Sequence, residues 1–260
     1  MAKLVEQANP QITWARFKEI VRLLRERKIL QGETTLYITP RLLHIKLWAE
    51  WWDVYGDGVD PKEFAKDLPP QLAAWFLEML RYARESNAAL KIAERLLDEA
   101  GAFGVADCFV DGQASRFFRA LAEAAPKPAL RMLQRTVGTW DVDQLRELGG
   151  DRRRQIVWAL EGITVWREFF ADAARMLLKL AEAENEQISN NATGVFVELF
   201  SPGHGPVAPT EAPLDERFPV LKEAFDSPSP TQREIAFKAC DEGLKTAFFS
   251  RMVGASSVRL

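Results

Sequence analysis

Histidine is the side chain best suited to acid–base catalysis and metal binding near neutral pH, and the sequence contains only two. His44 lies in LHIKLW, where a half-buried structural histidine is expected. His204 lies in SPGHGPVAP, a loop too rich in proline and glycine to hold a catalytic group rigidly. A surface loop of this kind can touch another protein, so His204 is a candidate partner-binding residue.

Carboxylates and cysteines are the other common catalytic and metal-binding groups. Glu182, Glu184 and Glu186 alternate in KLAEAENEQ, which is typical of a solvated helix end. Cys108 and Cys240 lie far apart, which indicates two buried free thiols in a reducing compartment rather than a disulfide or a zinc site. The sequence contains no P-loop, G-x-G-x-x-G motif or nucleophile elbow. We therefore expect no enzymatic activity, no cofactor and no bound metal.

The segment NEQISNNATG is the most unusual polar run in the chain. Its serine and asparagine side chains are expected to cap the helix that follows, by binding backbone N–H groups of its first turn. Capping employs one or two of them, which leaves the others to order the loop or to contact another molecule. Asn185, Asn190 and Asn191 are therefore candidate partner-binding residues. Asn191 also begins a glycosylation sequon, which a cytosolic chain would not expose to the transferase.

Tryptophan is the residue most typical of protein interfaces, and the chain has eight. Trp48, Trp51 and Trp52 share one broad helix face and are predicted to pack the N-terminal element against the helices that follow. Four others lie singly on apolar faces and are expected to belong to the core: Trp75, Trp140, Trp158 and Trp166.

The elements that carry these residues begin with an amphipathic helix over residues 14–27, for which Thr13 is a suitable N-cap. The next segment, KILQGETTLYITP, predicts a short hairpin turned at Gly32. Pro40 then begins a second helix at its first helical position, and this helix ends near Gly56. Helix, hairpin and helix in this order are typical of the back half of a winged-helix domain, so residues 1–58 are predicted to form a winged-helix-like element.

The basic residues Arg22, Arg25 and Lys28 near the end of the first helix are candidate nucleic-acid contacts if this element binds DNA. Cations at a helix C-terminus also suit a solvated face that complements the helix dipole. Both interpretations stay open.

Helical patterns follow one another from Asp60 onward, separated by proline and glycine. The predicted spans are 60–66, 69–84, 87–100, 113–125, 127–137, 141–148, 151–163, 166–185, 190–200, 214–226 and 229–248. They come in short-linked pairs of about 40 residues, which favours an irregular HEAT- or tetratricopeptide-like solenoid over residues 59–260. A compact irregular bundle is the alternative, because no repeat motif aligns through the chain. The predicted fold class is all-α.

Composition limits the function classes. The chain is 47% hydrophobic and 27% charged, as expected of a folded protein, and its 34 basic and 37 acidic residues leave a net charge of −3. Bulk charge therefore does not favour nucleic-acid binding. The sequence has no signal-peptide pattern and no apolar run near the roughly 20 residues that span a bilayer, so we expect a soluble cytoplasmic protein without a membrane partner.

The segment ITPRLLHIKLWAEWWDVYG resembles the part that follows the ATPase core in large bacterial STAND NTPases, including antiviral AVAST-type and NLR-like proteins. The stretches RRRQIVWALEGITVWREFFADAARMLLKLAEAENE, SNNATGVFVELF and TEAPLDERFPVL extend this resemblance over most of the chain. It implies a winged-helix end and part of a helical-repeat sensor region. Walker A and Walker B motifs are absent, so no nucleotide-binding residue can be carried over.

Two functional hypotheses follow. The first is a regulatory, ligand-sensing helical-repeat region of a STAND-type NTPase in prokaryotic defence, which binds a protein ligand and relays to an ATPase module. The second is a winged-helix transcriptional regulator that binds DNA through Arg22, Arg25 and Lys28.

Overall fold

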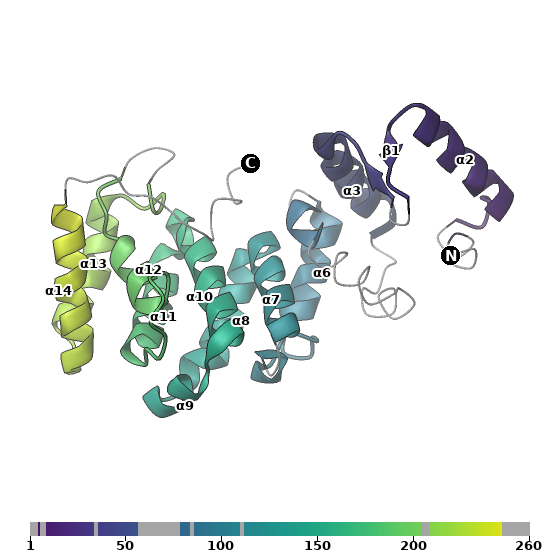
Figure 1. The fold of residues 1–260 in the computed structure, drawn as a ribbon. Coiled ribbons are helices and arrows are strands. Elements are labelled where there is room, and N and C mark those ends of the chain that lie inside the picture. Colours follow the sequence, from purple (N-terminus) through teal and green to yellow (C-terminus); the bar gives the residue numbers. More distant parts are fainter. Residues whose placement is uncertain are drawn as a thin grey trace. The chain divides into compact units, whose positions relative to one another are not determined.

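A computed structural model describes residues 5, 9–33, 36–56, 79–83, 86–109, 112–203 and 208–245. Most of these residues are helical, and they include one small two-stranded sheet (Figure 1). The predicted all-α class is confirmed at this level. Internal contacts divide the chain into two compact units, residues 1–92 and 93–260. Within the described ranges, no helix is long and apolar enough to cross a membrane.

The first unit contains the predicted helix and hairpin. Helix α2 (Trp14–Glu26) begins after Thr13, whose hydroxyl accepts a hydrogen bond from the backbone N–H of Arg16. Strands β1 (Leu30–Gln31) and β2 (Tyr37–Ile38) pair antiparallel. Gly32 follows β1 with a φ of 102°, a left-handed conformation that glycine adopts without strain. The hairpin prediction is therefore confirmed.

Helix α3 (Arg41–Tyr55) contributes Trp52 to the core of the first unit. Pro40 is the N-cap residue of α3, so the first helical position, where Pro40 was predicted, belongs to Arg41. The helix packs on the 3-10 helix η2 (Leu80–Ala83), and Trp52 is completely buried. A Cβ on Gly56 would lie 2.8 Å from the Trp52 ring, so glycine allows α3 to end against this side chain.

The second unit contains a continuous series of helices. Helix α6 (Asn87–Leu97) spans the division between the units. The elements that follow are η3 (Ala106–Phe109), α7 (Gly112–Ala124), α8 (Pro126–Arg135), η4 (Val137–Thr139), α9 (Val142–Glu147), α10 (Gly150–Thr164), η5 (Arg167–Phe169), α11 (Phe170–Glu182), α12 (Ala192–Glu198), α13 (Leu214–Phe225) and α14 (Pro230–Leu244).

The most extensive contact in this unit joins α7 to α10, and α10–α11, α11–α12 and α13–α14 are further packed pairs (Figure 1). Helices α7, α10, α12 and α14 contact one another in that order, and α8, α11 and α13 form a second row against them. Helices α10 and α11 lie in the middle and bury the most residues. Ile156, Val157 and Leu160 of α10 have no exposed surface. Burying side chains of this size contributes about 1.5–3 kcal/mol each, so α10 and α11 form the core of the unit.

The predicted helices agree with the observed ones within a few residues wherever the structure describes them. Three predictions concern residues outside the described ones and stay predictions. They are the helix over 60–66, most of the helix over 69–84, and the domain boundary after residue 58. Cys108 and Cys240 form no disulfide with each other, as predicted. Cys108 is buried, whereas Cys240 is half-buried, because α14 presents it at the side of its buried face.

Candidate functional site

Three tryptophans of the second unit, Trp140, Trp158 and Trp166, are partly buried. Trp166 packs against the fully buried Val165, so the predicted core position holds in part, and the fourth predicted core tryptophan, Trp75, lies outside the described residues. Aliphatic residues fill the buried faces of the helices. Trp140 follows η4 and Trp166 follows α10, so both indoles lie at helix ends, where a periodic apolar face no longer determines burial.

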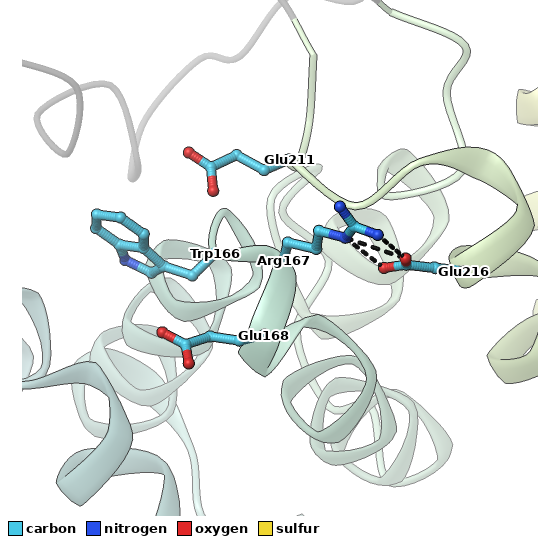
Figure 2. Close-up of a pocket in the computed structure, with 5 residues that line it drawn as sticks. All are labelled: Trp166, Arg167, Glu168, Glu211 and Glu216. Carbon is cyan, nitrogen blue, oxygen red and sulfur yellow. Dashed lines mark hydrogen bonds and ion pairs between the residues drawn. The ribbon is translucent and has the colours of Figure 1, made fainter.

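Trp166 lines an open pocket of about 350 Å³, which we call the Trp166 pocket. Its other lining residues are Arg167, Glu168, Glu211 and Glu216. Figure 2 shows the carboxylates of Glu168 and Glu211 on two sides of the indole, while the Arg167 side chain extends away from it toward Glu216. Segments far apart in sequence therefore meet in this pocket.

The backbone holds the two halves of the Trp166 pocket together. Glu211 donates its backbone N–H to the carbonyl of Val165 at 2.8 Å. The hydroxyl of Thr210 also reaches this carbonyl, at 3.5 Å, and accepts a hydrogen bond from the backbone N–H of Ala212 at 3.1 Å. The loop before α13 is thereby fixed to the end of α10, directly beside Trp166.

Charge in the Trp166 pocket is unevenly compensated. Arg167 donates from Nε to both carboxylate oxygens of Glu216 at 3.0 Å, and its Nη2 also bonds this carboxylate. These bonds lower the pKa of Glu216 from its ordinary value of 4.5 and raise the pKa of Arg167. Glu168 and Glu211 are exposed and have no ion pair among the described residues. The pocket therefore presents an indole and two uncompensated carboxylates.

A second open pocket, of about 540 Å³, surrounds Trp140. It lies among η3, α9 and α10, and its lining mixes the indole with charged and polar side chains. The lining residues are Ala106, Asp107, Phe109, Trp140, Gln144, Glu147, Leu148 and Arg152.

Asn191, one of the predicted partner-binding residues, is the N-cap of α12. Its Oδ1 accepts a hydrogen bond from the backbone N–H of Gly194 at 2.8 Å, and its Nδ2 donates to the carbonyl of Glu186 at 2.8 Å. A Cβ on Gly194 would lie 1.9 Å from the carbonyl oxygen of Ser189, so only glycine fits beneath this turn. The capping prediction for this segment is confirmed.

Asn185 and Asn190 lie in the same loop but differ in their bonding. Asn185 donates from Nδ2 to the carbonyls of Arg146 at 2.6 Å and Leu148 at 3.1 Å, where α9 ends. It therefore holds the wall of the pocket around Trp140. Asn190 is half-exposed, and its side chain makes no hydrogen bond to any described residue. Their predicted contact with a partner stays a prediction, and His204 lies outside the described residues.

Arg153 was missed by the sequence analysis, and it joins three elements. Its guanidinium is fully buried and donates to the carbonyls of Leu145 at 2.9 Å, Leu148 at 3.4 Å, Leu180 at 2.5 Å and Ala183 at 3.1 Å. These carbonyl groups lie at or next to the ends of α9 and α11, where intrahelical donors run out. Burial lowers the pKa of Arg153, and the carboxylate of Glu184, 3.4 Å from Nε, opposes that effect.

Trp48, Trp51 and Trp52 form one aromatic cluster in the first unit. The Trp48 and Trp51 rings stack with centroids 5.6 Å apart, and Trp52 meets both edge-on. Trp48 donates from Nε1 to the carbonyl of Met79 at 2.9 Å. The cluster therefore joins α3 to η2 within this unit, and the predicted packing between domains stays a prediction. His44 on α3 is half-buried, and burial lowers its pKa.

The candidate nucleic-acid contacts take part in local bonds. Arg22 pairs with Glu26 at 2.9 Å, and Arg25 donates to the carbonyl of Gly32 beside the hairpin. Lys28 is exposed, with a φ of 58°, where α2 turns into β1. Their contact with DNA stays a prediction, which mobility shifts across a range of salt concentrations would test.

Among the residues that the structure describes, no group of three or more His, Cys, Asp or Glu side chains is arranged to hold a metal ion. No protein-family model matches the chain, and neither a curated protein nor a solved structure matches it. The candidate site therefore has to be interpreted from its own geometry.

Only a weak signal in the sequence indicates the Trp166 pocket. Trp166, Arg167 and Glu168 adjoin directly after the last apolar residue of α10, where a helix end exposes consecutive side chains. Glu211 and Glu216 come from a segment more than 40 residues later. Periodicity within one helix cannot bring such segments together.

Proposed function

We propose that this chain is a helical-repeat region that recognises a protein ligand, with an irregular HEAT- or tetratricopeptide-like solenoid after a small winged-helix-like element. Solenoids stack short helical units so that each unit contacts mainly its neighbours. The two rows of helices from α7 to α14 support this proposal, because successive helices of each row contact one another and the helices of the other row. The hairpin between α2 and α3 supports the winged-helix-like part.

The observation that carries the proposal is the pair of open pockets around Trp140 and Trp166. A partly exposed tryptophan buries further apolar area when a partner covers it, and tryptophan and arginine are the residues that contribute most at protein interfaces. Both pockets combine such an indole with arginine and carboxylate side chains. This composition suits an interface with a protein surface that carries charge.

The resemblance to the region after the ATPase core of STAND NTPases gives this recognition a regulatory role. Ligand bound to the helical unit would have to favour one arrangement of the molecule over another in order to affect a neighbouring ATPase module. We propose that this is the function of the chain in prokaryotic defence. Binding at the pockets around Trp140 and Trp166 is the step that would begin the signal.

Capture of partners from the native cell tests the recognition proposal. We expect tagged wild-type chain to retain a defined set of proteins that the Trp140→Ala/Trp166→Ala variant loses. Phe237→Ala is the matched control, because Phe237 is 66% exposed on α14 and lines neither pocket. Capture of the same proteins by wild type and by the double variant would contradict the proposal.

Nucleotide hydrolysis tests the regulatory part separately. We expect a captured partner to release phosphate from ATP at a rate that the wild-type chain changes and that the Trp140→Ala/Trp166→Ala variant leaves unchanged. If no captured protein hydrolysed nucleotide, the proposed regulation of a STAND-type ATPase module would be contradicted, whereas the proposed protein recognition would not.

A further inference from the structure

The Trp166 pocket combines an indole with carboxylate side chains. Glu168 and Glu211 lie beside the indole, whereas Arg167, the one basic side chain among the described lining residues, extends toward Glu216 (Figure 2). Among the described residues, no arginine or lysine lies over the Trp166 ring or pairs with either of the two free carboxylates. An indole that lines a pocket beside two carboxylates is an arrangement that attracts a cation.

The same unit shows what this arrangement binds when a cation is supplied. Arg119 on α7 places its guanidinium carbon 5.3 Å from the centre of the Trp158 ring on α10. The Nε of Arg119 also lies 3.4 Å from a carboxylate oxygen of Glu123. An indole and a carboxylate therefore hold one guanidinium within this protein. The Trp166 pocket has the same two kinds of group, with a second carboxylate in addition.

We propose that the Trp166 pocket receives an arginine side chain of the protein ligand. The guanidinium stacks on the indole and donates hydrogen bonds to Glu168 and Glu211. Arginine suits the pocket better than lysine, because its planar, weakly hydrated cation stacks on a ring and offers donors on several sides, whereas an ammonium is a compact and strongly hydrated charge. This inference rests on the proposed protein recognition and identifies the chemistry of the bound segment.

Titration of the purified full chain with N-acetyl-L-arginine amide tests the pocket directly. The indole N–H resonance of Trp166 is assigned by its loss in the Trp166→Phe variant. We expect this resonance and the backbone amide of Glu211 to shift in a saturable manner, with a Kd on the order of millimolar for so small a ligand. The neutral isostere, N-acetyl-L-citrulline amide, is expected to cause no saturable shift, and the lysine counterpart is expected to bind more weakly.

Charge-matched variants separate this site from general attraction to an acidic protein. Glu168→Gln/Glu211→Gln is expected to weaken arginine binding by roughly fivefold, because it removes both carboxylates and leaves the indole. Glu234→Gln/Asp241→Asn on α14 removes the same charge away from the pocket and is expected to leave the Kd unchanged. Equal shifts with citrulline, equal binding of lysine, or an unchanged Kd in Glu168→Gln/Glu211→Gln would each overturn the inference.

Failure of this inference is distinguishable from failure of the proposed function. If the double tryptophan variant loses its partners but the chain does not bind the arginine compound, protein recognition stands and the arginine site is wrong. If the chain binds arginine but capture is unaffected by the tryptophan substitutions, the pocket binds a guanidinium and the proposed recognition is wrong.

Discussion

Arg153 is a fully buried charge whose bonds are all directed at helix ends. Replacing it with methionine removes these hydrogen bonds from the carbonyls at the ends of α9 and α11 and leaves Glu184 without its buried cation. We expect Arg153→Met to lower the free energy of unfolding by about 3–5 kcal/mol, measured by urea denaturation followed by circular dichroism. The free energy of unfolding of Arg153→Lys is expected to lie between those of wild type and Arg153→Met, because one ammonium cannot reach four carbonyl groups.

Arg146→Gln is the matched control for the buried arginine. Arg146 keeps 56% of its side chain exposed and pairs only with Asp143 on its own helix, so its loss is expected to change stability by less than about 0.5 kcal/mol. If Arg146→Gln and Arg153→Met lowered the free energy of unfolding equally, the buried hydrogen bonds of Arg153 would contribute no more to stability than an exposed ion pair.

The neighbouring residues Asn190 and Asn191 allow a helix-capping side chain to be compared with one that makes no hydrogen bond to a described residue. Asn191 caps α12, so Asn191→Ala is expected to lower the free energy of unfolding by about 1 kcal/mol, and Asn191→Ser is expected to restore part of it. Asn190→Ala is expected to change stability by less than about 0.5 kcal/mol. Urea denaturation of the three variants measures this difference. A loss for Asn190→Ala as large as for Asn191→Ala would contradict the assignment of the cap.

At the residue scale, the sequence predicts bonding only where both partners are close in the chain. The cap at Asn191 is three residues from the N–H it binds, so it could be predicted. Arg153 reaches carbonyls as far away as Ala183, and an arginine in RRRQIV gives no sign that it is the buried one of three. The partial exposure of Trp166 was not predicted for a related reason, since exposure at a helix end depends on which distant loop covers the side chain.

At the element scale, two ion pairs attach α13 to the preceding helices. Arg167 pairs with Glu216, and Arg175 pairs with Glu223 at 2.7 Å and 2.8 Å. Hydrogen bonds from these arginines lower the pKa values of Glu216 and Glu223 below their ordinary value of 4.5. A carboxylate whose pKa is lower in the folded state stabilises the fold above its unfolded pKa and loses this effect as the pH falls through the folded pKa.

Stability measured against pH tests the contribution of these pairs. We expect Glu216→Gln/Glu223→Gln to be less stable than wild type at pH 7 and to approach wild type as the pH falls below about 4.5. The effect is modest because both pairs are solvent-exposed, and added salt is expected to reduce it further. Urea midpoints from pH 7 to pH 3 provide the measurement. A difference that stayed constant over this range would show that the carboxylates act through packing and not through charge.

The elements themselves were the most predictable part of the fold. Three- and four-residue apolar spacing, bounded by proline, glycine and capping residues, placed α7, α10 and α14 within a few residues of their ends. The predicted helix 166–185 instead begins with η5 and ends earlier, at Glu182. A change from 3-10 to α geometry leaves almost the same apolar spacing, so the pattern cannot reveal it.

At the scale of the whole molecule, burial differs greatly between the helices. Helix α2 has no buried residue, whereas α10 and α11 contain many, among them Ile156, Leu160 and Leu177 with no exposed surface. Periodicity alone does not predict which helix is more buried. The pattern of α2 is clearly amphipathic, whereas the polar start of α10, GDRRRQ, suggests a solvated helix. Burial of α10 follows from its position between α7 and α11, which no single segment encodes.

This gradient predicts the order in which the backbone opens. Amides protected by buried apolar contacts exchange only through large-scale unfolding, whereas those of a helix without a buried face exchange through local opening. Hydrogen exchange at pH 7, followed by mass spectrometry of peptides from α2, α10 and α11, is therefore expected to be on the order of a hundredfold or more slower in α10 and α11 than in α2. Arg153→Met is expected to accelerate exchange in α10 and α11 and to leave α2 unchanged, because the arginine bonds only within the second unit. Protection in α2 equal to that in α10 would mean that α2 is covered by something other than the residues described.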